Sequence, residues 1–235
     1  MVTDEKTATG RQPLSRERVL VAAVELADQG GLDALTMRAL AERLDVEAMS
    51  LYHHVANKED LLDGACEKVL EEINDAVAGL PLATGPNDWK QVLRNRILTA
   101  RSVVVRHKWL PAVLETRTTM SRPTLQYHHD ILAIFRGGGF SYDLAHHALH
   151  ALGSRALGFT QELFDPAPGS EEEEQSMEMM EQMAAEVPLL FEMLAEVVHD
   201  DPEETIGWCD DQTEFEFALD LLLDGLDRRL SEERP

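Results

Sequence analysis

The sequence predicts an all-α protein in which an N-terminal unit of three helices precedes a larger helical domain. Apolar residues recur at helical spacing through most of the 235 residues, as at Leu20, Ala23, Val24 and Ala27. No run alternates apolar and polar residues with the β-branched enrichment that strands need. A stretch containing Pro and Gly, residues 80–87, forms a linker between the two parts.

The composition excludes several classes of protein. Hydrophobic residues make up 44% and charged residues 28% of the chain, as in an ordinary globular protein. No stretch approaches the roughly 18 uncharged apolar residues that span a bilayer, and residues 1–10 lack the apolar segment of a signal peptide. We therefore expect a cytoplasmic protein with no membrane partner. Cys66 and Cys209 lack the spacing of a disulfide framework or a thiolate zinc site.

Capping residues define the helices of the N-terminal unit. Ser15 is an N-cap residue for a first helix, which the Gly30–Gly31 pair ends. Thr36 caps a second, short helix, and a turn at residues 45–48 links it to a third over residues 48–54. Asn57, with Asp60 three residues later, starts a long fourth helix that runs to about residue 79.

Helical patterns resume after the linker. They predict helices over residues 88–107, 109–117, 122–136, 141–164, 176–199 and 210–230. Three consecutive glycines at 137–139 end the third of these helices. Residues 165–175 are rich in Pro, Gly and Glu, which predicts a mobile, solvated loop.

Two short helices that are joined by a tight turn and preceded by a packing helix have the plan of a helix-turn-helix. The reading helix needs only about two turns, because its N-terminal half alone reaches base edges in a major groove about 12 Å wide. Apolar residues would hold it against the other helices: Leu44, Val46, Leu51 and Val55. Met49, Ser50 and His53 would then face outward, while Tyr52 and His54 would flank the groove at phosphates.

The motifs of this unit resemble a known family. Residues 35–41, LTMRALA, and residues 51–62, LYHHVANKEDLL, are similar to the signature of the tetracycline-repressor (TetR) family. Three later segments resemble the C-terminal domain of the tetracycline-repressor subgroup. They are RHKWLPAVLETR at 106–117, FSYDLAHHALHALGSRALGF at 140–159 and FEFALDLLLDGLDRRL at 215–230.

The resemblance implies a homodimeric repressor with a helix-turn-helix head on each subunit. The heads would occupy successive major grooves of a palindromic operator in double-stranded DNA, and a small-molecule effector would release them. The chain would divide into a flexible arm at 1–13, a DNA-binding head at 14–64 and an effector-binding and dimerisation domain at 65–235. By position, the DNA-contacting residues would be Thr36, Arg38, Ala48, Met49, Ser50, Tyr52, His53, His54 and Lys58.

Several of these positions have a second interpretation. Tyr52 could serve the core alone, since Tyr combines an apolar ring with a polar tip. Lys58 would bind phosphate near the positive N-terminus of the fourth helix, or be a solvated surface lysine. Residues 48–50 offer one hydroxyl and apolar contact with thymine methyls, so Arg38 is the best candidate for a bidentate guanine contact. A phosphate contact is the alternative for Arg38.

The charge is unevenly distributed along the chain. A net charge of −23 argues against nucleic-acid binding, which needs clustered cations. However, residues 11–64 carry only −4, whereas residues 65–235 carry −18. An acidic body away from the operator would lower non-specific binding and make operator affinity strongly dependent on salt.

The last predicted helix is too apolar for a surface helix. Its apolar positions are Phe215, Phe217, Ala218, Leu219, Leu221, Leu222, Leu223 and Leu226. The helix at 141–164 carries small residues that allow close approach: Ala145, Ala148, Ala151, Gly153, Ala156 and Gly158. We expect these two helices to pair with their symmetry mates in a four-helix homodimer interface. The alternative is that both are interior helices of a monomer.

The larger domain offers candidates for an unidentified effector. An apolar pocket between helices could be lined by Trp89, Trp109, Leu110, Val113, Leu114, Phe135, Leu152 and Phe159, with ordinary core packing as the alternative. Arg155 interrupts an apolar face. It would pair with Asp220 or Asp224, meet an anionic effector, or lie exposed.

Two positions distinguish this chain from the tetracycline repressors that it resembles. Thr116 and Arg117 match a Thr-Arg pair of that subgroup, which adds Arg117 to the pocket candidates. Val113 and Asn74 stand where the subgroup carries ligand-contacting histidines. The resemblance therefore transfers the fold but not the ligand.

No feature predicts a cofactor or catalysis. His146 and His150, with His147, have a spacing that suits zinc, but helix-face histidines are more often structural, and we assign no metal. The sequence lacks GxSxG, HExxH and a phosphate-cradling glycine loop, so we expect no enzyme. The remaining alternative to a DNA-binding regulator is a helical protein-interaction adaptor.

Overall fold

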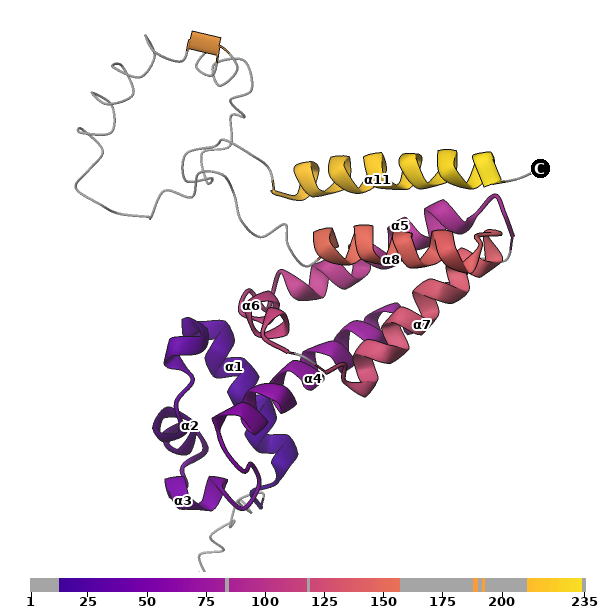
Figure 1. Cartoon of the computed structure of the whole chain (residues 1–235). Helices are drawn as coiled ribbons and strands as arrows, with labels where there is room; N and C mark the ends of the chain where they lie inside the picture. The colour runs from indigo at the N-terminus through magenta and orange to yellow at the C-terminus, as the bar shows by residue number, and fades with distance from the viewer. Residues whose placement is uncertain are drawn as a thin grey trace, which may run out of the picture. The chain divides into compact units, whose positions relative to one another are not determined.

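A computed structural model describes residues 13–82, 85–117, 119–156, 188–189, 192 and 211–233. Within these ranges the regular elements are all α-helices, as the sequence predicts (Figure 1). They are α1 Arg16–Ala34, α2 Met37–Leu44, α3 Ala48–Leu51, α4 Lys58–Ala78, α5 Trp89–Val104, α6 Leu110–Glu115, α7 Arg122–Gly137, α8 Tyr142–Ala156 and α11 Asp211–Glu233. The predicted loop at 165–175, nearly all of the predicted N-terminal arm and most of the helix at 176–199 lie outside the described residues.

Side chains cap the helices of the N-terminal unit where the sequence predicts. The Ser15 hydroxyl accepts from the Arg18 N–H at 3.3 Å, and the Thr36 hydroxyl accepts from the Ala39 N–H at 3.1 Å. The Asn57 amide oxygen accepts from the Asp60 N–H at 2.9 Å. Each contact satisfies one of the N–H groups that a helix start leaves without an intrahelical partner.

The Gly30–Gly31 pair kinks α1 and does not end it as predicted. Gly31 has φ of 69°, a backbone conformation that favours glycine, and Gly30 is also non-helical. One more turn follows to Ala34, because Leu35 beyond it is fully buried and its N–H donates to the Leu32 carbonyl. Burial of the Leu35 side chain stabilises this last turn, which packs against the core after the kink at Gly30 and Gly31.

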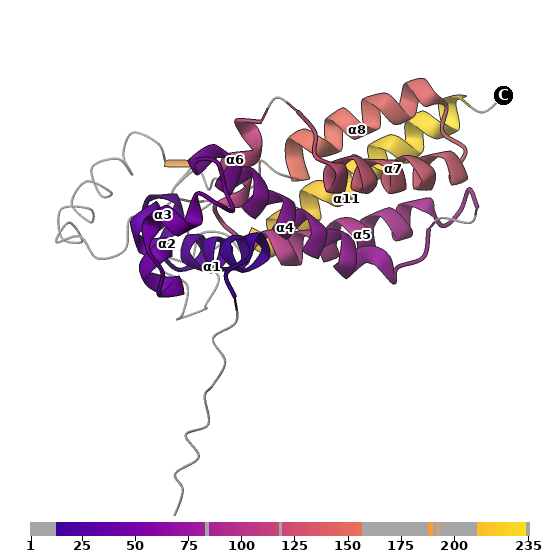
Figure 2. The same cartoon turned by 90° about the horizontal axis from the view of Figure 1, so that it is seen from below.

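One apolar core runs from the N-terminal unit into the following helices. Its buried members include Val19, Leu40, Leu51, Leu61, Val69, Ala100, Val103, Trp109 and Val113. α4 starts beside α1 and continues along α5 and α7 (Figures 1 and 2). The N-terminal unit is therefore not an isolated module: α4 and the end of α5 share its core.

A second apolar cluster lies where α5 begins and α7 ends. The Trp89 ring packs edge-on against Phe140 at 4.7 Å between centroids, and Phe135 lies 4.8 Å from Phe140. All three aromatic side chains are almost fully buried. Gly138 also packs against the Trp89 side chain, since a Cβ at this position would lie 2.7 Å from the Trp89 Cγ.

α8 and α11 differ in what they leave exposed. On α8, Ala145 and Ala148 are fully buried within the chain, so these small residues serve packing inside the subunit. On α11, one face is buried at Phe215, Leu219, Leu223, Leu226 and Leu230, while Phe217 and Leu221 are 61% and 58% exposed. None of the described helices combines the length and the apolar character needed to cross a membrane.

Gly138→Ala should destabilise the fold, because its added methyl meets the rigid Trp89 ring. Overpacking of this kind costs about 1–3 kcal/mol, which would lower Tm by several degrees. Gly79→Ala is the matched control: both glycines follow a helix with right-handed backbone angles, but open space surrounds Gly79. Equal Tm values for the two variants would contradict the packing described here.

Candidate nucleic-acid interface

The turn between α2 and α3 has a defined backbone. Asp45 is in the left-handed region with φ of 55°, and its N–H donates to the Glu42 carbonyl at 3.1 Å. The Val46 N–H then reaches back to the Ala41 carbonyl at 3.0 Å. Asp tolerates this conformation better than most residues, so the chain leaves α2 sharply and α3 begins at Ala48.

α3 is shorter than the helix predicted over residues 48–54. It ends at Leu51, whose carbonyl accepts from both His54, at 2.8 Å, and Val55, at 3.0 Å. Such tightening is common in a last helical turn. The His54 carbonyl does not continue the helix, because it accepts a hydrogen bond from the Arg16 guanidinium at 2.8 Å.

The α3 segment is anchored on one side and open on the other. Leu51 and Val55 are buried, at 0% and 1% exposure, and fix the segment to the core. The side chains that it leaves in solvent are Met49, which is 73% exposed, Tyr52, which is 47% exposed, and His53. Ala48, Ser50 and His54 are half-buried. Met49 and His53 are therefore exposed as the sequence predicts, whereas Ser50 is only half-exposed.

Arg16 and Asp60 hold this segment in place. The Arg16 guanidinium donates to both oxygens of Asp60, at 2.7 and 3.1 Å, as well as to the His54 carbonyl. Asp60 also accepts from the Ala56 N–H at 2.8 Å. The hydrogen bond from Arg16 and that from Ala56 lower the pKa of Asp60, so it is ionised at neutral pH. One arginine thus links the start of α1, the end of the α3 segment and the start of α4.

The cations of this unit fall into two groups. Arg16, Arg43 and Lys68 form ion pairs with Asp60, Glu25 and Glu17, respectively. Arg38 and Lys58 are exposed, and no acidic side chain among the described residues pairs with them. These two positive charges are available to an external anion. Both belong to the predicted DNA-contacting set, as does the exposed Thr36.

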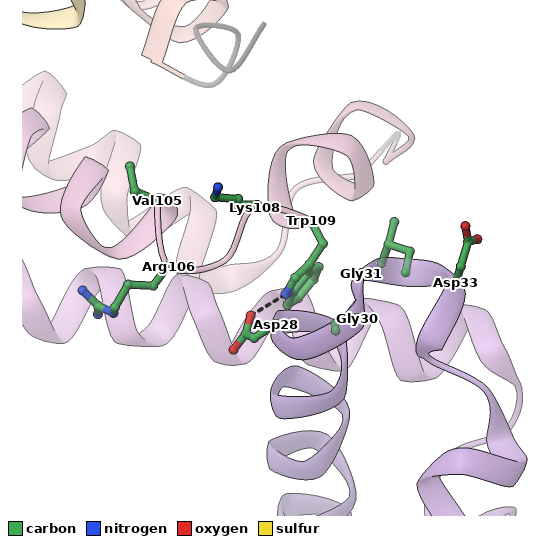
Figure 3. A pocket seen from close by; sticks show the side chains of 10 residues that line it. Asp28, Gly30, Gly31, Asp33, Val105, Arg106, Lys108 and Trp109 are labelled. Atoms are coloured by element: carbon green, nitrogen blue, oxygen red, sulfur yellow. Dashed lines mark hydrogen bonds between the residues drawn. The ribbon is translucent and has the colours of Figure 1, made fainter. Parts of the chain in front are cut away.

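A hydrogen-bonded junction centred on the buried His107 ring joins α1 to α4 and to the segment between α5 and α6. The Nδ1 atom of His107 lies 2.8 Å from the Oδ1 atom of Asp28 in α1, and its Nε2 atom lies 3.3 Å from the Oε2 atom of Glu72 in α4. The Trp109 indole N–H donates to the same Asp28 oxygen at 2.7 Å (Figure 3). A groove of about 640 Å³ lies beside this bond, between the kink of α1 and residues 105–109.

Charge balance also acts at this junction. Burial alone would raise the pKa of Glu72, but hydrogen bonds from Arg106 and the charge of His107 outweigh it and lower the pKa. The carboxylate is therefore ionised where three elements meet. A movement of α4 relative to α1 would have to break these contacts.

The predicted effector residues do not form one group. Trp109 and Val113 are buried in the core shared with the N-terminal unit, whereas Trp89 and Phe135 belong to the aromatic cluster at the other end of α5. α5, whose 16 residues make it about 24 Å long, has Trp89 at its start and the shared core at its end. Leu152 is buried on α8 and Leu114 is half-buried. Phe159 and the side chain of Arg155 lie outside the described residues.

Arg117 faces the start of α4. Its guanidinium lies 2.8 Å from a Glu59 oxygen and 2.9 Å from an Asp63 oxygen. It lines a cleft of about 390 Å³ together with Cys66, Thr116 and Thr124. Burial raises the pKa of Cys66 to about 12, so this thiol stays protonated and unreactive at neutral pH.

A buried polar cluster lies among α4, α5 and α7. Arg96 is 2% exposed: it donates to Asp130 and, at 3.4 Å, to the Val77 carbonyl, and it lies 5.8 Å from the centre of the Tyr127 ring. Asn74 donates to the Pro123 carbonyl at 2.9 Å. The Arg96 Nε atom and the Asn74 Oδ1 atom are buried without a hydrogen-bond partner among the described residues. Burial raises the pKa of Tyr127 to about 12, so its phenol is neutral.

The sequence did not single out Arg16, Asp28, His107 or Arg96. Arg16 and Asp60 are 44 positions apart, and Asp28 and His107 are 79 positions apart, so no local spacing indicates either contact. The helix predicted over residues 88–107 contains four other arginine or lysine residues, so nothing in the sequence distinguishes Arg96 from them. Only Asp60 had a sequence signal, as the third residue after an N-cap.

The fold and this face define a helix-turn-helix DNA-binding protein. Two family descriptions match the chain: "Bacterial regulatory proteins, tetR family" over residues 19–65 and "Tetracyclin repressor-like, C-terminal domain" over residues 80–230. The chain belongs to the TetR family of transcriptional regulators.

Two similar proteins are described as helix-turn-helix transcriptional regulators. A helix-turn-helix transcriptional regulator from Saccharopolyspora erythraea is 34% identical over 136 residues, which are 58% of this chain and 55% of that protein. The transcriptional repressor DrrR1 from Streptomyces coeruleorubidus is 28% identical over 96% of this chain and 84% of its own length. Both relatives agree with the assignment of a DNA-binding regulator, and the second match extends over almost the whole chain.

Solved structures share the fold. A possible TetR family regulator from Streptomyces coelicolor has a TM-score of 0.66 and 30% identity, covering 91% of this chain and 99% of its own. ActR from the same organism, solved in complex with actinorhodin, has a TM-score of 0.69 and 24% identity, covering 92% of this chain and 96% of its own. At 24% identity, the similarity to ActR shows a shared fold only.

Asp60→Asn should lower Tm near neutral pH, because the amide has no negative charge and offers Arg16 one acceptor oxygen instead of two. The lowered pKa of Asp60 means that its contribution is complete above about pH 4, the unfolded value, and is lost as pH falls through the folded pKa below it. The Tm difference between wild type and variant should therefore shrink in acid.

Asp75→Asn is the control, since Asp75 is an exposed carboxylate of the same helix for which the described residues supply no ion-pair partner. It should change Tm little at any pH. A difference between wild type and Asp60→Asn that stays constant from pH 7 to pH 3 would argue against the ionised clamp.

Proposed function

We propose that this protein is a dimeric repressor that binds a palindromic operator through its heads, residues 14–64, and leaves it when a small molecule binds the remainder of the chain. The observation that carries the DNA-binding part is the pairing of charges in the head. Arg38 and Lys58, at the predicted contacts, have no described acidic partner, whereas Arg16 and Arg43 of the head are paired, as is Lys68 just beyond it on α4. Unpaired cations on an exposed face are what phosphate binding needs.

The contacts divide by chemistry. The exposed Met49 and the half-buried Ser50 of α3 would meet base edges, while Tyr52, His53, His54 and Lys58 would contact phosphates along the groove edge. Thr36 and Arg38 open α2 and would contact the backbone and an outer base. This division follows from exposure and from the donor groups each residue has.

The dimer would form through α11 and α8. Phe217 and Leu221 lie one turn apart on α11 and are both more than half exposed, although the opposite face of this helix is buried. An apolar face of this kind favours a second copy of the chain as its cover. Two linked heads would bind two half-sites at once, which raises affinity without new contacts in either head.

The effector would enter the polar cluster of α4, α5 and α7. ActR binds actinorhodin and a TetR variant from Acinetobacter baumannii binds minocycline, which supports a small organic ligand for a family member of this kind. The Arg96 Nε–H and the Asn74 Oδ1 offer one donor and one acceptor on facing helices. An effector with an acidic or carbonyl oxygen next to a hydroxyl would satisfy both.

The signal would pass from this cluster to the head through α4. Asn74 and Glu72 are two residues apart on α4, and Glu72 contacts His107, which contacts Asp28 of α1. A shift of α4 on effector binding would strain this junction and change the spacing of the two heads. Effector binding would thus favour a state in which the contacts of His107 with Asp28 and Glu72 are broken.

The DNA-binding part is tested by selection from a library of random duplexes with the full chain, which should recover an inverted repeat. Lys58→Ala should weaken binding to that duplex about tenfold and reduce the slope of log affinity against log salt by about 0.9 per head. Lys68→Ala, which removes an equal but paired charge, should leave the slope unchanged. Failure to retain any duplex, or equal effects of the two variants, would refute the proposal.

The effector part is tested with the double variant Arg96→Met/Asp130→Leu, which removes the buried charge pair together and leaves no unpaired ion. In a thermal-shift screen of acidic hydroxylated compounds, a ligand at 100 times its Kd should stabilise the wild type by about 2.7 kcal/mol. The double variant should lose that response and still bind the selected duplex. Retention of the ligand response would exclude Arg96 from the site.

A further inference from the structure

α8 displays a pair of histidines that the DNA-binding and effector functions do not use. His146 and His150 are four residues apart, and their ring centroids are 4.6 Å apart at an interplanar angle of 76°. Both side chains are exposed on the surface of the helix. Residues at this spacing share one helix face. We propose that this pair binds a late first-row divalent metal ion of the zinc and nickel class.

The distance between the rings suits one shared ion. Two imidazoles on a tetrahedral zinc ion, with Zn–N near 2.0–2.1 Å and ring centres roughly 1.1 Å behind the nitrogens, have ring centres about 5 Å apart. The observed 4.6 Å needs only a small side-chain rotation to reach that value. The helix therefore already brings the two ligands together.

His147 is not part of the chelating pair. Its ring centroid is 5.8 Å from that of His146, and it is the next residue along the helix, so it points about 100° away around the axis. Among the described residues, no group of three His, Cys, Asp or Glu side chains converges as a metal site. The described residues thus supply two nitrogen ligands, and we propose that water or the same pair of a second copy completes the shell.

Ligand type and charge decide which ions bind. Imidazole nitrogen favours zinc, nickel and copper, whereas magnesium and calcium require oxygen ligands. The net charge of −23 also raises the local concentration of divalent cations around the protein. The site goes beyond the proposed repressor function and does not depend on it.

Calorimetric titration of the full chain with Ni²⁺ tests the site. The wild type should bind one ion per chain, or one per two chains where a second copy contributes its pair, and either ratio supports the assignment. His146→Ala and His150→Ala should each lower Ni²⁺ affinity at least tenfold. Alanine at an exposed helix position favours the helix, so both variants should keep the wild-type Tm.

Two histidine variants serve as controls. His129→Ala removes an exposed histidine on α7, and His147→Ala removes the neighbour of the pair; both should keep the wild-type affinity within twofold. Mg²⁺ should give no saturable heat. Equal losses in all four variants, or wild-type Ni²⁺ binding by His146→Ala and His150→Ala, would overturn the proposal whether or not the protein binds its operator.

Discussion

The geometry of the head depends on the carboxylate of Asp60. It accepts from the Arg16 guanidinium and from the Ala56 N–H, while its own N–H donates to the Asn57 side chain. Arg16 in turn holds the His54 carbonyl, so the last turn of the recognition segment cannot lengthen. Four residues of helix are enough for this segment, because hydrogen bonds to α1 and α4 fix the chain directly after it, at the His54 carbonyl and the Ala56 N–H.

A strongly acidic chain can carry a DNA-binding head because some of its cations form ion pairs with carboxylates, while others have no acidic partner among the described residues. In the head, Arg16 and Arg43 form ion pairs with carboxylates of α4 and α1, and these pairs hold the helices together. Two cations on the outer face have no such described partner. Local pairing, and not the net charge of −23, thus determines where the protein can meet a phosphate backbone.

The shared core explains how a head of this size could respond to a distant ligand. Trp109 and Val113 pack into the same core as the head, and Trp109 and His107 both contact Asp28 of α1. α4 runs from the clamp at Asp60 past Glu72 to Asn74. The head and the polar cluster around Arg96 are therefore linked by one rigid helix and one hydrogen-bonded junction, two elements through which coupling free energy can pass.

Local signals in the sequence determined the helix order and the capping residues Ser15, Thr36 and Asn57, because a cap acts over three residues. They also identified the helix-turn-helix and the family. They could not determine that α1 resumes after Gly31, that α3 ends at Leu51, or that Trp89 and Trp109 belong to different clusters. Those outcomes rest on contacts between residues far apart in the chain, such as Arg16 with Asp60 and Asp28 with His107, whose energies appear only once the helices have packed.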